Sequence, residues 1–152
     1  QGLAAEGAAL RKELIDSIQK DTESFTAYMN ALGMPKNTDE EKAARKEAMQ
    51  NGLKEAAEVP LAVAETALKI FHVAGAVVER GNANAVTDGL VASMMARTAV
   101  LSALLNVKIN LGSIKDEEFV ARMAAKVAEL EKAAMDGEKA VMELSALTRD
   151  LV

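Results

Sequence analysis

Hydrophobic residues recur through residues 3–32 at the spacing of one helix face. Separations of three, four or seven residues predict one long helix there, and its apolar stripe comprises Leu10, Leu14, Ile18, Phe25, Met29 and Leu32. Asp21 falls on the same stripe, between Ile18 and Phe25. A carboxylate among apolar positions is the first polar feature that amphipathic packing does not explain.

A turn at residues 33–37 ends this helix, and a capping box begins the second one. Thr38 is placed to act as the N-cap and Glu41 as the N3 residue, so that each side chain bonds the other's backbone amide. Lys36 stands just before this helix entrance, either as an exposed loop lysine or as part of a site.

Pro60 predicts a kink or a restart of the helix in the next stretch of the chain. Proline has no amide hydrogen and disfavours helix at the residue before it, so we expect the second helix to end near Glu58. A third helix is then expected over residues 61–80. It is apolar on most sides, which is typical of a helix at the centre of a bundle.

A polar segment with the sequence GNANAVTD separates this helix from a fourth. Gly81 suits a helix C′ position in the left-handed conformation, and Thr87 or Asp88 suits the N-cap of the next helix. Capping leaves one of these two polar side chains unexplained, together with the amides of Asn82 and Asn84.

The fourth helix is expected to begin at residue 87 or 88 and to end near Leu111. It is nearly free of charge apart from Arg97 and Lys108, so we expect it to be buried. Asn106 and Asn110 are four residues apart and share one helix face. Two amides on an otherwise apolar face need hydrogen-bond partners if they are buried.

A heptad-like pattern marks the last helix, which Ser113 or Asp116 caps and which we expect to reach the C-terminus. Its apolar and small residues alternate by three and four: Val120, Met123, Val127, Leu130, Ala134, Gly137, Val141, Leu144, Thr148 and Leu151. The pattern is typical of a core or an oligomer seam.

Composition supports an all-α fold, a bundle of about five long antiparallel helices in one domain over residues 1–152. Good helix formers dominate, and there are only two prolines. The chain opens in what reads as the interior of a helix, so we expect its natural N-terminus to be missing.

Composition also excludes several classes of function. The net charge of −5 argues against a nucleic-acid-binding surface. The absence of cysteine rules out disulfides, thiolate nucleophiles and cysteine-based zinc sites, and one histidine is too few for a histidine-rich metal site, so we expect no metal. No apolar run reaches membrane-spanning length without a charge or a strongly polar group, and no signal peptide is evident. These features predict a cytoplasmic protein that binds neither nucleic acid nor membrane.

The remaining chemistry consists of carboxylates, amides and an ammonium group. Such a set suits the binding of a polar heterocycle and the movement of protons. No phosphate loop or dinucleotide fingerprint is present. His72 lies beside Phe71 in the apolar third helix and is expected to be a core or partly exposed packing histidine. The eight methionines fall mostly at helical spacing, as core filler does.

Five segments in this order resemble one family, the cyclodeaminase/cyclohydrolase family, which includes the C-terminal domain of formiminotransferase-cyclodeaminase. They are Asp21–Phe25, Met34–Thr38 with Glu40, Glu41 and Arg45, Val59–Leu61, Gly81–Asp88, and Asn106–Leu111. The resemblance runs from about Leu10 to Phe119. The family carries a glycine-rich motif near its N-terminus that has no counterpart here. A site to which that motif contributes would be incomplete in this chain.

The resemblance implies an all-α, dimeric enzyme of one-carbon metabolism and histidine degradation. Members of the family convert 5-formiminotetrahydrofolate to 5,10-methenyltetrahydrofolate with loss of ammonia, or hydrolyse the methenyl compound. We therefore expect a homodimer that takes a tetrahydrofolate derivative as its substrate. Of the two reactions, we expect the cyclodeaminase reaction, with the cyclohydrolase reaction as the alternative.

Both reactions need a group that accepts and donates protons at the one-carbon unit, and a positioned carboxylate can serve. Asp88 is the leading candidate and Asp21 the second, while a pure N-cap is the alternative role for Asp88. The amides expected to hold the pterin or the one-carbon unit, or else to join buried helices, belong to Asn82, Asn84, Asn106 and Asn110. The cations expected to meet the glutamate tail, or else to be solvated, are Lys36, Arg45 and Lys108.

A different class of function is a non-catalytic helical interaction module, built on the heptad-like pattern at residues 120–151. The two interpretations differ in where they place the polar side chains. An enzyme needs Asp88 and the four asparagines near one another, whereas a scaffold gains little from that arrangement.

Overall fold

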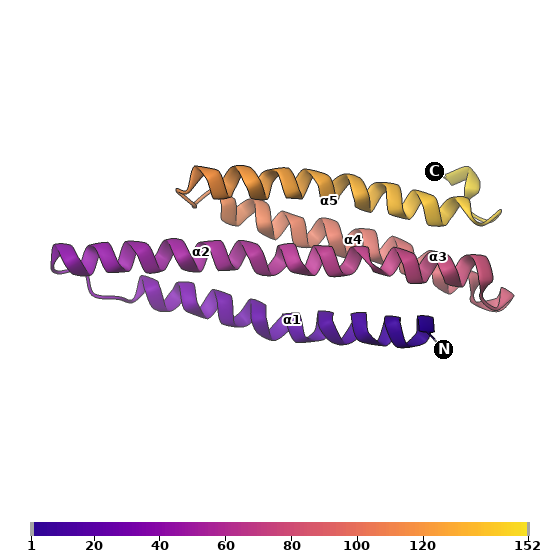
Figure 1. The fold of residues 1–152 in the computed structure, drawn as a ribbon, viewed down its shortest axis with the longest axis horizontal. Coiled ribbons are helices and arrows are strands. Elements are labelled where there is room, and N and C mark those ends of the chain that lie inside the picture. The colour runs from indigo at the N-terminus through magenta and orange to yellow at the C-terminus, as the bar shows by residue number, and fades with distance from the viewer. Residues whose placement is uncertain (1, 152) are drawn as a thin grey trace.

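Five α-helices run along one common direction in the computed structural model, which describes residues 2–151 (Figure 1). The helices are α1 (Gly2–Leu32), α2 (Asp39–Leu68), α3 (Ile70–Arg80), α4 (Val86–Leu111) and α5 (Glu117–Glu143). Two short 3₁₀ turns, η1 (Ala83–Ala85) and η2 (Arg149–Leu151), complete the described part, which contains no strand. The prediction of an all-α bundle of antiparallel helices is confirmed.

The helix α2 and its continuation α3 form the middle of the bundle. Figure 1 shows α2 and α3 nearly end to end, with α1 on one side and α4 and α5 on the other. Within residues 2–151, α1 packs against α2 and α3 but makes no contact with α4 or α5. The side of the bundle between α1 and α4 is therefore not closed by another helix of the chain.

The main core lies where α2, α4 and α5 meet. It is built from alanines and medium-sized apolar side chains, which are Leu53, Ala57, Ala64, Ala67, Val100, Ala103, Leu104, Val107, Ile114, Phe119, Met123, Val127, Leu130 and Ala134. Helix α1 joins α2 at Gly52, where an added Cβ would lie 3.0 Å from the Cα of Tyr28. Small residues at such crossings let two helix backbones approach closely.

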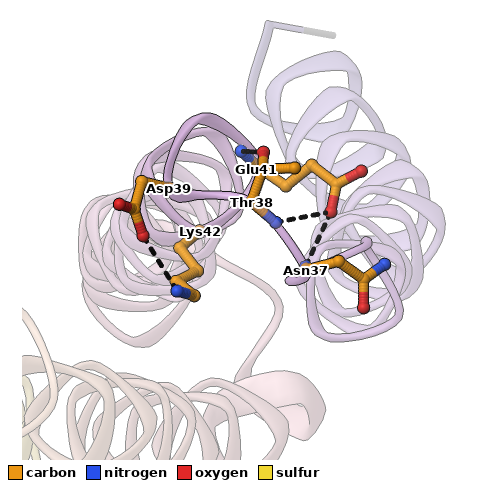
Figure 2. A network of polar contacts seen from close by, with 5 residues as sticks. All are labelled: Asn37, Thr38, Asp39, Glu41 and Lys42. Carbon is orange, nitrogen blue, oxygen red and sulfur yellow. Dashed lines mark hydrogen bonds and ion pairs between the residues drawn. The ribbon is translucent and has the colours of Figure 1, made fainter.

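The predicted capping box at the start of α2 is present (Figure 2). The Thr38 hydroxyl oxygen accepts the backbone N–H of Glu41 at 3.2 Å. The Glu41 carboxylate accepts the backbone N–H groups of Thr38 at 3.2 Å and Asn37 at 2.7 Å. Lys42 pairs with Asp39 at 2.9 Å on the same turn. These bonds hold the connection between α1 and α2, in which Lys36 is exposed.

The predicted restart of the helix at Pro60 is wrong, because α2 continues through Pro60 to Leu68. The missing proline N–H would have bonded the carbonyl of Ala56, and the Asn110 amide of α4 donates to that carbonyl instead, at 2.8 Å. The chain interrupts its helix only at Lys69, where the Lys69 N–H reaches the Thr66 carbonyl at 3.2 Å. The second helix is therefore longer, and the third shorter, than the sequence predicts.

The Asn110–Ala56 bond makes a testable prediction. Replacing Asn110 with Leu leaves a carbonyl inside the α2–α4 contact without a donor, and should lower the free energy of unfolding by about 1–3 kcal/mol. Replacing Pro60 with Ala restores an N–H for Ala56, so Pro60→Ala should recover much of the loss in the double variant. Urea unfolding of the four proteins in this double-mutant cycle measures the coupling. Additive effects would show that the bond does not support α2.

Two further expectations for the last helices need correction. Helix α4 is not buried all round, since Val91 and Ile109 are 54% and 76% exposed. Helix α5 ends at Glu143 rather than at the C-terminus. In a continued helix the Met142 carbonyl would accept a backbone N–H from the next turn. Here it accepts the Thr148 hydroxyl at 2.8 Å.

The heptad-like pattern on α5 is an intrachain seam over most of its length. Its buried members within the helix are Met123, Val127, Leu130, Ala134 and Val141. The last positions of the pattern, Leu144, Thr148 and Leu151, lie beyond the helix, and Leu144 and Leu151 are exposed. The apolar face of α5 packs on α4, α2 and α3 of the same chain. It is therefore not free to bind another protein, as an interaction module would require.

Two helical stretches, residues 39–80 and 83–111, are long and apolar enough to cross a membrane by length and composition. In each, 39% of the most apolar window is buried in the bundle. Core helices of bundles share this composition. The other residues of these two windows lie outside the core.

Candidate functional site

A groove of about 380 Å³ lies between α1 and α4, on the side that no helix closes. Pro60 and Val63 of α2 line it together with residues of α1 and α4, which are Leu14, Ser17, Ile18, Asp21, Thr22, Ala99, Ser102, Ala103 and Asn106. The groove brings together two of the predicted site residues, Asp21 and Asn106. They are far apart in sequence and reach the same groove from different helices.

The polar groups of the groove mainly accept hydrogen bonds. The hydroxyls of Ser17 and Thr22 donate to carbonyls one turn earlier in α1, at 2.8 and 3.0 Å. Their lone pairs remain for a ligand, as do those of the Asp21 carboxylate. The Asn106 amide nitrogen lies 3.5 Å from the Ser102 carbonyl of its own helix. The groove therefore suits a flat ligand that carries several N–H donors and buries its ring faces against Leu14 and Ile18, two apolar side chains of α1.

The sequence interpretation missed three hydroxyl residues of this groove, namely Ser17, Thr22 and Ser102. Helical spacing offered a signal for two of them. Ser17 lies one turn before Asp21 on α1, and Ser102 lies one turn before Asn106 on α4. Serine and threonine on a helix surface are common, so the signal became specific only once α1 and α4 faced one groove.

The polar turn after α3 has its own local structure. The Asn82 side-chain oxygen accepts the backbone N–H of Asn84 at 3.0 Å and begins the short turn η1. Helix α4 follows with Ala85 at its N-cap and no side-chain cap, so the prediction that Thr87 or Asp88 caps α4 is wrong. Asp88 is exposed in the first helical turn, where a carboxylate is favoured by the helix dipole. Its carboxylate is not occupied by capping.

Gly81 does not adopt the predicted left-handed conformation. Its backbone is extended, with φ −76° and ψ −177°. Glycine is nevertheless required there, because an added Cβ would lie 2.3 Å from the carbonyl oxygen of Val77. The need arises from close approach to the end of α3 rather than from a positive φ.

Within one chain, the structure does not bring the turn and the groove together. Asp88 and Asn106 lie on the same helix, eighteen residues apart. At 1.5 Å per residue they are separated by about 27 Å along its axis. The predicted site residues thus form two groups, a turn group (Asn82, Asn84, Asp88) and a groove group (Asp21, Asn106).

The remaining predicted binding residues have other partners or lie apart. The Arg45 guanidinium donates through Nε and Nη2 to the Leu32 carbonyl at 3.3 and 3.2 Å, which caps the end of α1. Lys108 pairs with Glu131 of α5. The Asn110 amide is used by α2, as described above.

His72 is exposed on α3, and its Nε2 lies 3.9 Å from a carboxylate oxygen of Glu6 of α1, so it does not lie in the core. Among the side chains of residues 2–151, no group of three or more His, Asp or Glu is arranged to hold a metal ion.

Asp116 caps α5 near the end of α4. Its carboxylate accepts the Phe119 backbone N–H at 3.0 Å and pairs with Lys54 at 2.7 Å. The hydrogen bond from the Lys54 ammonium, and then that from the Phe119 N–H, hold the pKa of Asp116 below its ordinary value of 3.8. A depressed pKa of the folded state stabilises the protein above that ordinary value and stops doing so as the pH falls through the folded pKa.

Substitution of Asp116 by Asn should therefore lower the melting temperature at neutral pH, because the amide cannot pair with Lys54 as an ion. The difference from the unsubstituted protein should shrink as the pH falls below 3.8, the carboxyl's ordinary pKa. Thermal melts between pH 7 and pH 2.5 measure this, with Glu117→Gln as the matched control in the same turn. A difference that stays constant down to the lowest pH would contradict the ionic role.

The chain is similar in sequence to folate enzymes over most of its length. A family model described as formiminotransferase-cyclodeaminase matches residues 1–129. Methenyltetrahydrofolate cyclohydrolase of Methylorubrum extorquens is 44% identical over 110 residues, which cover 72% of this chain and 53% of that protein. Formimidoyltransferase-cyclodeaminase of Gallus gallus is 36% identical over 132 residues, or 87% of this chain and 24% of that protein.

The fold agrees with this relationship. Formiminotetrahydrofolate cyclodeaminase from Thermotoga maritima superposes with a TM-score of 0.77 at 29% identity, over 95% of this chain and 66% of that one. The chain spans about half the length of the cyclohydrolase relative and less of the cyclodeaminase relatives. The extent of the matched sequence and the shared helical bundle show that this chain belongs to the formiminotransferase-cyclodeaminase family.

Proposed function

We propose that this chain takes part in folate-dependent one-carbon chemistry, as a cyclodeaminase that converts 5-formiminotetrahydrofolate to 5,10-methenyltetrahydrofolate and ammonia. The observation that carries the proposal is the groove between α1 and α4, which Asp21 and Asn106 line together with apolar side chains. Its volume of about 380 Å³ lies in the range of small-molecule sites. The names of the relatives and of the similar structure support the substrate class.

The proposed reaction requires proton transfers that carboxylates can perform. The N10 nitrogen of the folate attacks the formimino carbon, and its proton passes to a base. The formimino nitrogen then takes up protons and leaves as ammonia, so the carbon ends as a methenyl bridge between N5 and N10. We assign this proton transfer to Asp88, with Asp21 as the second candidate, because each presents an exposed carboxylate.

The amides and cations would position the substrate. Asn106, from the groove group, would bind the pterin ring, and Asn82 and Asn84, from the turn group, would bind near the one-carbon unit. Lys36 is exposed near one end of the bundle, where an ammonium group can meet the carboxylates of a glutamate tail. Arg45 and Lys108 would have to leave their present partners to do the same.

Hydrolysis of 5,10-methenyltetrahydrofolate is the second candidate function. Water adds to the methenyl carbon, and the bond from that carbon to N5 then breaks, which leaves a formyl group on N10. Of the two protons of the water, one passes to N5 and the other is released, and the same carboxylates can move them. The observation that favours it is the 44% identity to a methenyltetrahydrofolate cyclohydrolase.

The two activities are separated by supplying each folate alone and following the absorbance of the methenyl compound. A rise with 5-formiminotetrahydrofolate supports the deaminase, and an accelerated decay of added methenyl compound supports the hydrolase. An absence of both, in the natural full-length protein, would contradict the proposed function.

A homodimer is part of the proposal. The side of the bundle between α1 and α4 carries exposed apolar residues on both helices, among them Ile18 and Phe25 at 68% and 62% exposure. A single copy leaves this side open to solvent. Gel filtration or sedimentation should therefore give the mass of two chains.

A further inference from the structure

The Asn110 side chain joins two helices at one end of the candidate groove. Its amide nitrogen carries two hydrogens and donates to the Ala56 carbonyl of α2 at 2.8 Å and to the Asn106 carbonyl of its own helix at 3.0 Å. A carbonyl oxygen can accept a hydrogen bond only from the nitrogen of the amide, so the two acceptors fix which way this amide faces. This pair of bonds, the Asn110 bridge, engages both donor hydrogens of the side chain within the protein.

Pro60 makes the Ala56 carbonyl available to this bridge. In a regular helix, each carbonyl accepts the backbone N–H of the residue four positions later. Four positions after Ala56 stands Pro60, which has no N–H to donate. The Asn110 amide supplies the missing donor from α4, so the bond joins the two helices at one defined height.

The Asn110 bridge stands one helical turn from two residues of the groove. Pro60 lies four residues after Ala56 on α2, and Asn106 lies four residues before Asn110 on α4. Because α2 and α4 run in opposite directions (Figure 1), both steps lead the same way from the bridge. Pro60 and Asn106 both line the groove. One turn is about 5.4 Å of rise, so the bridge fixes the height of Asn106 relative to the Pro60 ring.

The side chain of Asn106 is itself weakly held. It is exposed, and its amide nitrogen lies 3.5 Å from the Ser102 carbonyl, beyond the usual N–H···O range of about 2.7–3.2 Å. The direction of such a side chain depends on the backbone that carries it. That backbone is held by Asn110, whose amide bonds the Asn106 carbonyl in addition to the N–H that a helical carbonyl accepts.

Small residues of the core let the bridge form. Ala57 of α2 and Ala103 of α4 are buried in the main core, and Ala103 also lines the groove. Small side chains allow helix backbones to approach closely, so a side chain as short as asparagine reaches the backbone of the neighbouring helix. Close packing limits how far α2 and α4 can separate, whereas the bond limits how far they can slide along each other.

We propose that Asn110, acting with Pro60, is a positioning residue that sets the height and direction of Asn106 in the groove. The inference rests on the proposed function, in which Asn106 binds the pterin ring. Asn110 does not bind the pterin, because both of its donor hydrogens are engaged by carbonyls. The pterin ring is remote from the reacting carbon. Misplacing Asn106 therefore weakens substrate and transition state equally, which raises KM and leaves kcat unchanged.

Steady-state kinetics of Asn110→Leu test this role. KM for the folate that the protein transforms should rise by about 2- to 12-fold, the equivalent of one hydrogen bond, while kcat stays unchanged. Val127→Ala is the control, because it empties part of the core on α5 and lowers stability without touching the bridge. Its KM should equal that of the unsubstituted protein. An unchanged KM in Asn110→Leu, or an equal rise in both variants, would overturn the positioning role.

The double variant Asn110→Leu with Pro60→Ala separates positioning from stability. Its Ala56 carbonyl regains a backbone donor, so the melting temperature should recover. KM should stay above that of Pro60→Ala alone, a variant that measures what loss of the proline ring contributes and whose Ala56 carbonyl can still accept the Asn110 amide with its second lone pair. A KM equal to that of Pro60→Ala alone would show that Asn110 only stabilises the bundle, and would overturn the proposal.

Nuclear magnetic resonance tests the positioning without any substrate. The order parameter of the Asn106 side-chain amide, from ¹⁵N relaxation, should fall in Asn110→Leu and stay the same in Val127→Ala. The signal is identified by its loss in Asn106→Asp. An unchanged order parameter in Asn110→Leu would overturn the proposal. If the order parameter falls as expected while the unsubstituted protein transforms neither folate, the proposed function fails and the structural role of Asn110 stands.

Discussion

Replacing Asp88 with Asn is expected to lower the folate turnover of the protein by about 10²- to 10⁴-fold, the usual effect of losing a positioned acid/base. The thermal melt should stay nearly unchanged, because Asp88 is exposed and does not cap α4. The amide has nearly the same size and can keep hydrogen bonds, but it cannot exchange a proton near neutral pH. Turnover is measured by methenyl absorbance and stability by circular dichroism.

The matched control for this variant is Glu79→Gln. Glu79 is another exposed carboxylate at the same end of the bundle, near the end of α3, and it pairs only with the adjacent Arg80. We expect its turnover and melting temperature to equal those of the unsubstituted protein. Unchanged turnover in Asp88→Asn would exclude Asp88 as the proton-transfer group. A joint loss of turnover and helicity would assign it a structural role at the start of α4.

Replacing Gly52 with Val is expected to cause a large loss of stability. Any Cβ at this position would lie 3.0 Å from the Cα and 3.2 Å from the backbone nitrogen of Tyr28, atoms that cannot move without shifting α1. Overpacking of this kind lowers the free energy of unfolding by about 1–3 kcal/mol, and occasionally by more. For a chain of this size the melting temperature should fall by roughly 2–4 °C for each kcal/mol.

Asn51→Val is the control for this substitution. Asn51 is the preceding residue of α2 and is exposed, so the change introduces the same β-branched side chain into the same helix without meeting α1. Its effect should remain within about 0.5 kcal/mol. Equal losses in the two variants would show that helix propensity, rather than the α1–α2 contact, limits stability.

Local rules predicted the parts of the fold that local interactions control. The extent of α1 follows from its periodicity, and the start of α2 follows from the reciprocal bonds of Thr38 and Glu41. Rules of the same kind failed at Pro60, because the donor that replaces the missing N–H comes from Asn110, 54 positions from Ala56 along the chain. Propensity describes one segment at a time and takes no account of such a partner.

The same distinction between local and tertiary information applies to the candidate site. Asp21, Asn106 and the turn at residues 81–88 were singled out because polar groups are unusual among apolar helical positions. Their arrangement could not be predicted from spacing, since Asp21 and Asn106 line one groove only because α1 and α4 both border it over α2. The assumption that Asp88 joins them within one chain fails because a straight helix holds residues eighteen positions apart at about 27 Å.

The sequence by itself determined that this chain forms long amphipathic helices, where most of them begin and end, and which family its polar segments resemble. These properties depend on the helical period and on short-range capping, which any stretch of the chain carries with it. Only the tertiary structure decided which apolar rows enter the core. Large apolar residues of α1 and α4, among them Ile18 and Ile109, remain exposed because α1 packs on α2 and α3 and not on α4. A helical period predicts that one face of a helix will be buried. The packing of whole helices decides which other helix or molecule covers that face.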